Sequence, residues 1–315
     1  MSASGPADAT MPRSPGELIL PTTWLRIAVV SALVLMVYWG PIRYTLIERW
    51  INDGNWSHGW LIPAFSCYFL WMHRKRLFSA TIRPSYLGAL VMVISLALYF
   101  ASAWWFRMSY PQAVSIVGVI LGATLLLGGW GLTKVAWFPI LFLLLAVPLP
   151  QQTYVQVTQP MRAFASSGAA LIMPVFAPGL YTEAQAVVID YIVPGGARGQ
   201  LNVEEACSGM RLMMAFVTLG VAMAYLGERP AWQRLVMVIA CVPIAIFCNT
   251  LRVTATGLFF VYGHEDLARG TPHQLLGFVM LAVALGLFSL LGYVLSHLFI
   301  EEAQGSAADS AAEPS

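Results

Sequence analysis

Long runs of apolar residues separated by short polar loops dominate this chain of 315 residues. A bilayer core of about 30 Å is crossed by about 20 helical residues. By that measure there are eight candidate spans, at residues 24–42, 57–72, 85–106, 112–130, 133–150, 207–226, 235–262 and 273–298. The second is short and contains Pro63, and the seventh is long enough to tilt or protrude. We therefore predict an all-α polytopic membrane helical bundle of about eight transmembrane helices.

Charged side chains are scarce in this sequence. Asp, Glu, Lys and Arg make up 10% of the residues, whereas hydrophobic residues make up 58%. A soluble domain carries about 25% charged residues. So few charges cannot cover a water-exposed surface of this size, which excludes a soluble enzyme, a disordered protein and a nucleic-acid binder. The lipid bilayer is therefore the expected surrounding, and the net charge of +2 is too small to indicate an anionic partner.

The sequence divides into one domain and two tails. Residues 1–20 are rich in Ser, Ala and Pro, lack the pattern of a cleaved secretory signal, and are expected to be disordered. Residues 21–300 form the predicted transmembrane domain. Residues 301–315 are acidic and rich in Ala and Ser, and are expected to be a second disordered tail.

Basic residues predict the orientation of the spans, because cytoplasmic loops are enriched in Lys and Arg. The densest basic cluster, residues 73–76 with Arg83, falls on the same side as the loops with Lys134 and Arg229 if eight spans alternate. We therefore expect that side and both termini to be cytoplasmic. The opposite side receives the long segment between the fifth and sixth spans.

This outer segment is predicted to combine a helix with a β-hairpin. Apolar residues at helical spacing over 154–176 indicate a helix along the membrane surface. Residues 186–193 (AVVIDYIV) form a β-rich run, residues 194–196 with Gly199 supply turn chemistry, and residues 200–203 can pair back. The sequence therefore predicts a small extracytoplasmic β-hairpin that leads directly into span six.

Cys207 is the most informative of the four cysteines. It stands at the outer N-terminus of span six, where free N–H groups and partial positive charge favour a thiolate. Glu204 and Glu205 act in the opposite direction, so the net shift of the thiol pKa stays open. No spacing of Cys and His fits a metal site, and no metal or organic cofactor is expected. The other cysteines lie inside apolar runs and are expected to be small buried hydrophobes: Cys67, Cys241 and Cys248.

Asn249 and Arg252 interrupt span seven, and polar groups in membrane helices are costly and usually functional. They are three residues apart, so they share a helical face. Counted from Leu235, Arg252 lies about 25 Å along the helix, in the outer leaflet. Either Arg252 snorkels to the interface, or it faces an inward polar site. The asparagine on the same face favours the inward site.

Three further residues qualify as members of an outer site. His273 opens span eight and His58 stands at the entrance of span two, and each is either a wetted interface residue or part of the site. Arg211 follows Cys207 by four residues on the same helical face. Its guanidinium either pairs with one of the preceding glutamates or binds an anionic group.

Cys207, Arg252 and His273 begin or cross three consecutive spans at one level if this topology is right. Thiol, imidazole and guanidinium are the groups that thiol acyl transfer needs. Histidine can take the thiol proton or protonate the leaving amine. Arginine can hold the developing oxyanion. The sequence therefore favours a cysteine enzyme whose site lies in or just outside the outer leaflet.

At these residues the chain resembles the exosortase/archaeosortase family of membrane peptidases. The similarity runs from about Trp56 to span eight. Its motifs are residues 56–63 (WSHGWLIP), 147–150 (VPLP), 203–211 (VEEACSGMR) and 249–253 (NTLRV), with His273 before Gly277.

The resemblance implies a membrane-embedded cysteine peptidase or transpeptidase of the bacterial inner membrane, with its site on the extracytoplasmic side. Its substrates would be membrane-anchored exported proteins with a C-terminal sorting tail, made of a short motif (often Pro-Glu-Pro), one membrane helix and a basic cluster. Cys207 would be the nucleophile that forms a thioester, with Arg252 and His273 as the other catalytic members. The expected supporting or substrate-binding residues are Arg211, Asn249, Glu205, Ser208 and His58.

Two other functions remain open on the residues alone. One is a transporter or channel in which Asn249, Arg252 and His273 line a path. A transporter would favour polar residues near the midplane and repeat symmetry, whereas here the polar residues gather toward one face and no repeat is seen. The other is a non-catalytic scaffold in exopolysaccharide export. The sequence does not indicate an oligomeric state.

Overall fold

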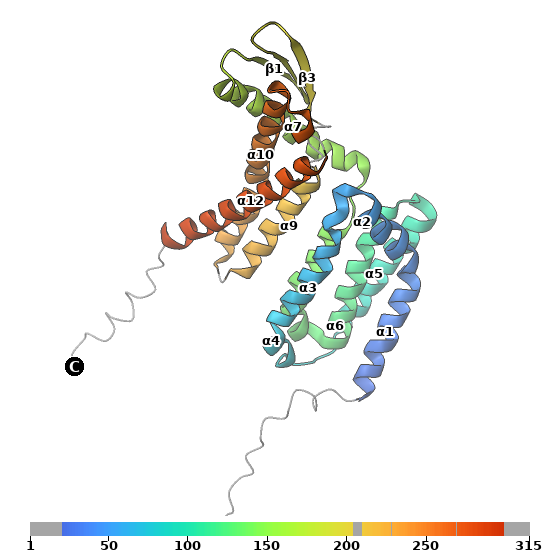
Figure 1. Cartoon of the computed structure of the whole chain (residues 1–315). Helices are drawn as coiled ribbons and strands as arrows, with labels where there is room; N and C mark the ends of the chain where they lie inside the picture. The colour runs from blue at the N-terminus through green and yellow to red at the C-terminus, as the bar shows by residue number, and fades with distance from the viewer. Residues whose placement is uncertain (1–20, 204–209, 228, 269, 299–315) are drawn as a thin grey trace, which may run out of the picture. The chain divides into compact units, whose positions relative to one another are not determined.

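The computed structural model describes residues 21–203, 210–227, 229–268 and 270–298. These residues are mainly helical, with one small antiparallel sheet (Figure 1). They form two compact units, the first of residues 21–50 and 59–148 and the second of residues 51–58 and 149–298. Most of each predicted tail lies outside the described residues, so disorder there stays a prediction.

The first unit is entirely helical. Its helices lie alongside one another, with α5 and α6 in the closest contact (Figure 1). The elements are α1 (Pro21–Gly40), the π-helix η1 (Pro41–Ile47), α2 (Glu48–Asn52, which ends in the second unit), α3 (Leu61–Met72), α4 (Arg74–Phe78), α5 (Leu87–Ala101), the π-helix η3 (Ser102–Phe106), α6 (Ser109–Phe142) and the 3-10 helix η4 (Leu143–Ala146).

Five of the described helices are long and apolar enough to cross a membrane, which confirms a polytopic helical membrane protein. The number of eight crossings stays a prediction. The second predicted span, 57–72, is shorter than expected, because α3 begins at Leu61 and residues 54–60 form the 3-10 helix η2 (Gly54–Trp60). Pro63 lies in the first turn of α3, where a missing N–H costs nothing. His58 therefore precedes the helix.

The fourth and fifth predicted spans are joined in α6 by a sharp break at Gly129. This residue has φ 71° and ψ −168°, a region that only glycine adopts readily. A side chain at Gly129 would collide with the backbone carbonyl of Arg83, whose N–H donates to the Gly128 carbonyl at 3.3 Å. The break divides α6 into two helical segments, which agrees with the two predicted spans.

Small residues bring α5 and α6 close together. Gly88, Ser95 and Ser102 recur every seven residues and form the buried face of α5 and its extension η3. Gly88 lies directly against the backbone of Gly122, and Ser95 against Gly118. In lipid, helices associate through this kind of close backbone approach, because the surrounding hydrocarbon gives them no hydrophobic driving force.

The second unit combines helices with a three-stranded sheet. The sheet lies against α7 at the end of the unit that holds the C-terminus of α10 (Figure 1). The elements are α7 (Gln151–Phe176), β1 (Tyr181–Gln185), β2 (Val188–Ile192), β3 (Arg198–Asn202), α9 (Met210–Leu226), α10 (Ala231–Val261), α11 (Glu265–Ala268) and α12 (Gly270–Leu298).

The predicted hairpin is present as β2 and β3, and the predicted helix over 154–176 lies within α7. The third strand, β1, was not predicted, because its sequence YTEAQ carries no run of β-branched residues. Ala186, expected in a strand, instead forms the β1–β2 turn with φ 53°. Gly199, expected in a turn, pairs with Tyr191 in the sheet. The Tyr191 ring covers Gly199 where a side chain would otherwise stand.

The inner face of the sheet closes the hydrophobic core of the second unit. Ile189, Leu201 and Val203 pack with three alanines of α7 and with Val253 of α10, and each is at most 9% exposed. The Thr182 hydroxyl also donates to the Ala170 carbonyl of α7 at 2.6 Å. The strand that leads to residue 204 is therefore held firmly against α7 and α10.

We predict that Gly129→Ala destabilises the protein. Alanine would have to adopt the positive φ of Gly129, and its methyl group would collide with the Arg83 carbonyl. The expected loss is roughly 1–3 kcal/mol, measured as a lower midpoint of thermal or denaturant unfolding in detergent. Gly286→Ala is the matched control, since nothing lies within 4 Å of its new methyl group and its backbone is helical. An equal effect of the two substitutions would contradict this account of the break.

Candidate functional site

Arg252 is buried inside the second unit. It lies on α10 with 2% of its surface exposed, and the next residue, Val253, belongs to the core beneath the sheet. A side chain that snorkelled to the interface would be exposed, so the inward placement is the one observed. Asn249 lies one turn earlier and is half-buried. Thr250, between them, packs against Gly168 of α7.

The contacts of α9 and α10 bring Arg252 level with the start of α9. Gly220 of α9 lies against Cys241, and Ala224, one turn later, packs with Met237, one turn earlier on α10. The two helices are therefore antiparallel. Followed back to the first residue of α9, ten residues before Gly220, this register reaches the turn of α10 that carries Arg252.

The third helix, α12, begins at the same end. The Gln233 amide of α10 donates to the Leu295 carbonyl at 3.2 Å, and Gly220 lies against Phe288. Helix α12 therefore runs parallel to α9 and antiparallel to α10. Its first turn, which holds His273, lies toward the end of the unit where α9 starts.

Several predicted site residues fall outside what the structure describes. Cys207, Glu205 and Ser208 are outside the described residues, and Arg211 and His273 are described only by their helical backbone. The convergence of Cys207, Arg252 and His273 therefore stays a prediction. The structure adds the common level of the α9 start, Arg252 and the first turns of α12.

The prediction that three cysteines are buried is right for two of them. Cys241 and Cys248 are buried on α10, but Cys67 is exposed. In a membrane helix the outward face is as apolar as the inward face, so sequence does not reveal which side a cysteine takes. On α3 the buried positions are Ile62, Ser66 and Phe69, and Cys67 lies on the opposite face.

A second buried polar cluster, which the sequence analysis did not find, lies where the segment 51–58 meets α7. The Trp56 ring stands between His58, with ring centroids 5.8 Å apart, and Tyr154, at 6.1 Å. His58 and Tyr154 are 7% and 3% exposed. Within the described ranges, neither ring nitrogen of His58 nor the Tyr154 hydroxyl has a hydrogen-bond partner. A wetted interface position for His58 is therefore excluded.

The sequence signal for this cluster is a polar stripe on α7. Tyr154, Thr158, Arg162 and Ser166 follow one another every four residues, and all four are buried or half-buried. The apolar periodicity that predicts this helix does not reveal the polar stripe on its other positions. Buried polar groups are usually satisfied, and those that are not require a structural or functional explanation.

Burial governs the protonation of this cluster. It lowers the pKa of His58 to about 4, and the nearby Asn55 carbonyl acts weakly in the other direction without meeting hydrogen-bond geometry. Burial also raises the pKa of the Tyr154 hydroxyl. The charge of Arg162 acts against this rise, and the charge of Asp53 adds to it. His58 is thus a neutral imidazole at neutral pH, able to donate one hydrogen bond and accept another.

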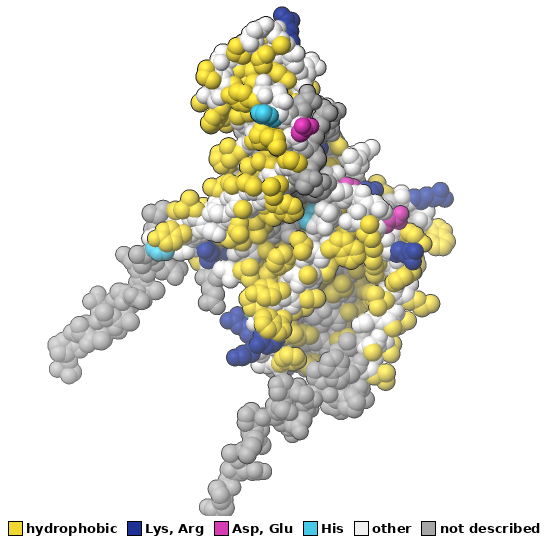
Figure 2. Space-filling model, viewed as in Figure 1, with side chains coloured by type: hydrophobic (Ala, Val, Ile, Leu, Met, Phe, Trp, Pro, Cys, Tyr) yellow, Lys and Arg dark blue, Asp and Glu magenta, His cyan; other side chains and the backbone are white. Residues whose placement is uncertain are grey.

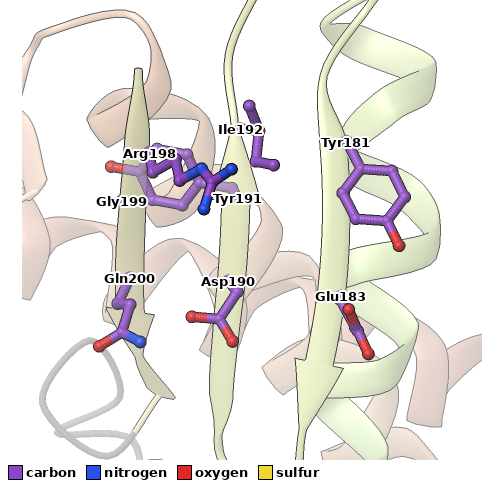
Figure 3. Close-up of a pocket in the computed structure, with 8 residues that line it drawn as sticks. All are labelled: Tyr181, Glu183, Asp190, Tyr191, Ile192, Arg198, Gly199 and Gln200. Atoms are coloured by element: carbon purple, nitrogen blue, oxygen red, sulfur yellow. The ribbon is translucent and has the colours of Figure 1, made fainter. Parts of the chain in front are cut away.

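The outer face of the sheet lines a shallow pocket with a volume of about 330 Å³ (Figure 3). The carboxylates of Glu183 and Asp190 stand on directly opposed residues of β1 and β2, and Gln200 follows on β3. Arg198 and Tyr181 line the next row. This surface contains no cysteine or histidine, so it does not supply acyl-transfer chemistry. Across the described ranges, no three His, Cys, Asp or Glu side chains are grouped to hold a metal.

We predict that acid destabilises the wild-type protein more than His58→Gln. The folded-state pKa of about 4 lies below the ordinary value of 6.5, so the unfolded chain takes up the proton first. The stabilisation is complete above about pH 6.5 and is lost as the pH falls toward 4, with a full size of about 3 kcal/mol. Apparent melting temperatures at about pH 7 and pH 5 measure it. The matched control is His297→Gln, on an exposed histidine of α12, which should keep the wild-type pH dependence. If His58→Gln also kept the wild-type pH dependence, this account of His58 would be wrong.

A family model matches most of the chain. The model of the family described as transmembrane exosortase (Exosortase_EpsH) matches residues 50–290. The matched segment includes Arg252, Asn249 and His58, as well as the position of Cys207. Comparison with curated proteins and with solved structures found no match. Since the matched segment spans 241 of the 315 residues, from the end of α2 through most of α12, this protein belongs to the transmembrane exosortase family.

Proposed function

We propose that this protein is a cysteine peptidase or transpeptidase that cleaves the C-terminal sorting tails of exported membrane-anchored proteins. Membership of the exosortase family supports a membrane enzyme that acts on proteins. The single observation that carries the proposal to a site is Arg252, a guanidinium 2% exposed on α10 and level with the start of α9. Retaining an arginine there is costly, which favours a function for it.

Chain connectivity supports a place for Cys207 near this arginine. Val203, fully buried, packs in the same core as Val253, the neighbour of Arg252. The four residues from Val203 to Cys207 span at most about 14 Å. Three residues after Cys207 the chain enters α9, which packs against α10. Both ends of the segment that carries the thiol are therefore tied to the helix that carries the guanidinium.

The proposed reaction forms and then breaks one thioester, and His273 carries its protons. His273 takes the proton of the Cys207 thiol, the thiolate attacks the carbonyl carbon of the scissile peptide bond, and Arg252 stabilises the negative charge on the carbonyl oxygen. The C–N bond then breaks, and His273 passes the proton to the leaving amine. Water or an acceptor amine attacks the thioester carbon and gives a proton to His273. The C–S bond then breaks, and His273 returns the proton to the sulfur, which releases the new C-terminus and regenerates the thiol. His58, Asn249, Glu205, Ser208 and Arg211 are proposed to support the site or bind the substrate.

The proposed place of reaction is the extracytoplasmic side of the bacterial inner membrane. Within the first unit, Arg83 and Lys134 lie near the break in α6, and Arg74–Arg76 lie on α4, which packs on the second segment of α6. Within the second unit, Arg229 and Arg234 lie at the α9–α10 turn, at the opposite end of α10 from the sheet. In the second unit the basic turn is at the end of α10 remote from Arg252, which supports a cytoplasmic place for that turn, because basic loops are enriched on the cytoplasmic side.

We predict that Cys207→Ser abolishes processing of a cognate tailed protein while the variant still inserts and folds. Co-expression followed by mass measurement of the substrate's C-terminus tests this. Cys67→Ser is the matched control, since this exposed cysteine of α3 has no part in the mechanism and should leave processing intact. Full processing by Cys207→Ser would refute cysteine catalysis. An unchanged substrate mass with the wild type and its cognate tail would refute the peptidase and favour the transporter or scaffold alternatives.

We predict that Arg252→Lys lowers the turnover rate by roughly 100-fold, the usual cost of losing one oxyanion donor. Lysine keeps the charge but loses the planar fork of donors. Arg234→Lys, on the same helix but remote from the proposed site, should retain wild-type turnover. The readout is the initial rate of tail cleavage, normalised to protein that elutes as a folded species. Equal rates for Arg252→Lys and the wild type would remove Arg252 from the mechanism.

A further inference from the structure

The first unit carries a cluster of positive charges at one end. No Asp or Glu occurs between residues 54 and 182, although this stretch contains seven Lys and Arg residues. Five of the seven, all exposed, form what we name the α4–α6 basic patch: Arg74, Lys75, Arg76, Arg83 and Lys134. Figure 2 shows Lys and Arg side chains gathered over α4. No carboxylate of the stretch 54–182 offsets these five exposed cations, and like charges repel one another unless an anion neutralises them.

The break in α6 brings these five residues together. Helix α4 packs through Leu77 on Ala136 and Ile140, so its basic residues lie beside the second segment of α6. The loop after α4 passes directly over the break, where the Arg83 N–H donates to Gly128. Lys134 belongs to the turn of α6 that immediately follows the break. Three separate stretches of sequence therefore contribute cations to one end of the unit.

Exposed aromatic rings surround the patch. Trp71, Trp130 and Trp137 are 59%, 55% and 47% exposed. The Arg74 guanidinium stands over the Trp71 ring, 4.4 Å from its centroid. Exposed tryptophan on apolar membrane helices marks the level of the lipid headgroups. The cations of the patch therefore lie at the depth where lipid phosphates lie.

We propose that the α4–α6 basic patch binds the phosphate headgroups of anionic phospholipids. Arginine matches phosphate oxygens with two parallel N–H donors, and three of the five residues are arginine. The tryptophan faces supply an apolar wall for the upper acyl chains. A soluble anion would gain nothing from that wall, which is why the lipid is the favoured ligand. The proposal is independent of the peptidase reaction, since no residue of the patch belongs to the proposed active site.

The test is native mass spectrometry of the detergent-purified full chain with phosphatidylglycerol or phosphatidylcholine added. The variant is Arg74→Gln with Lys75→Gln and Arg76→Gln. The matched control removes three cations elsewhere in the same half of the chain: Arg43→Gln, Arg49→Gln and Arg107→Gln, all exposed and none in the patch. Size-exclusion profiles and melting temperatures confirm that each variant is folded.

The wild type should retain phosphatidylglycerol in preference to phosphatidylcholine. Each basic residue near an anionic surface contributes roughly fivefold to binding. The patch variant should therefore bind phosphatidylglycerol at least about tenfold more weakly, and the control variant should bind like the wild type. Equal retention by the patch variant and the wild type would overturn the proposal, as would equal losses in both variants. Displacement of the lipid by millimolar inorganic phosphate would also overturn it, because the site would then be one for free anions.

Discussion

A bilayer offers no hydrogen bonds and no hydrophobic drive between helices, and this constraint accounts for most of the structure. Helices must associate through close packing, which Gly88, Gly118 and Gly122 provide between α5 and α6. Polar side chains must be paired or buried between helices. The Tyr38 hydroxyl lies 3.0 Å from the Ser115 hydroxyl for this reason, and the Trp50 indole donates to the Ala146 carbonyl at 2.9 Å. Because burying an ionisable side chain in such a bundle is costly, a buried one indicates function.

In the second unit, the buried polar side chains considered for the site lie on two helices and the segment before α3. Helix α10 buries Arg252, and α7 buries Tyr154 against the Trp56 ring, which also lies against the neutral imidazole of His58. The sheet has a mechanical part in this arrangement. By packing Ile189, Leu201 and Val203 on α7 and α10, it holds the chain firmly just before the segment that carries Cys207. In the mechanism that we propose, this packing helps to position the thiol.

The first unit differs from the second in its lipid-facing surface and in the placement of its charges. Its helices expose broad apolar surfaces, such as Met36 at 80% and Val93 at 62%, as lipid-facing helices do. Five of its cations lie together at one end, because the α6 break and the loop over it bring them together. Trp71 and Trp130 mark the level of the lipid headgroups at this end. The glycine that permits the break therefore influences both the packing of the unit and its electrostatics.

Sequence alone determined the membrane class, the helix at 154–176, the β2–β3 hairpin and the family, because these depend on long apolar runs, turn residues and local motifs. It did not determine the strand β1, the exposure of Cys67 or the polar stripe of α7. A strand with a single β-branched residue, Thr182, forms only when a neighbour pairs with it, as β2 pairs with β1. A lipid-facing side is as apolar as a buried one, so Cys67 gave no sign of its position. Only the tertiary structure decided that Arg252 points inward and that Trp56, beside His58, packs against Tyr154, because both depend on which segments pack together across long separations in the chain.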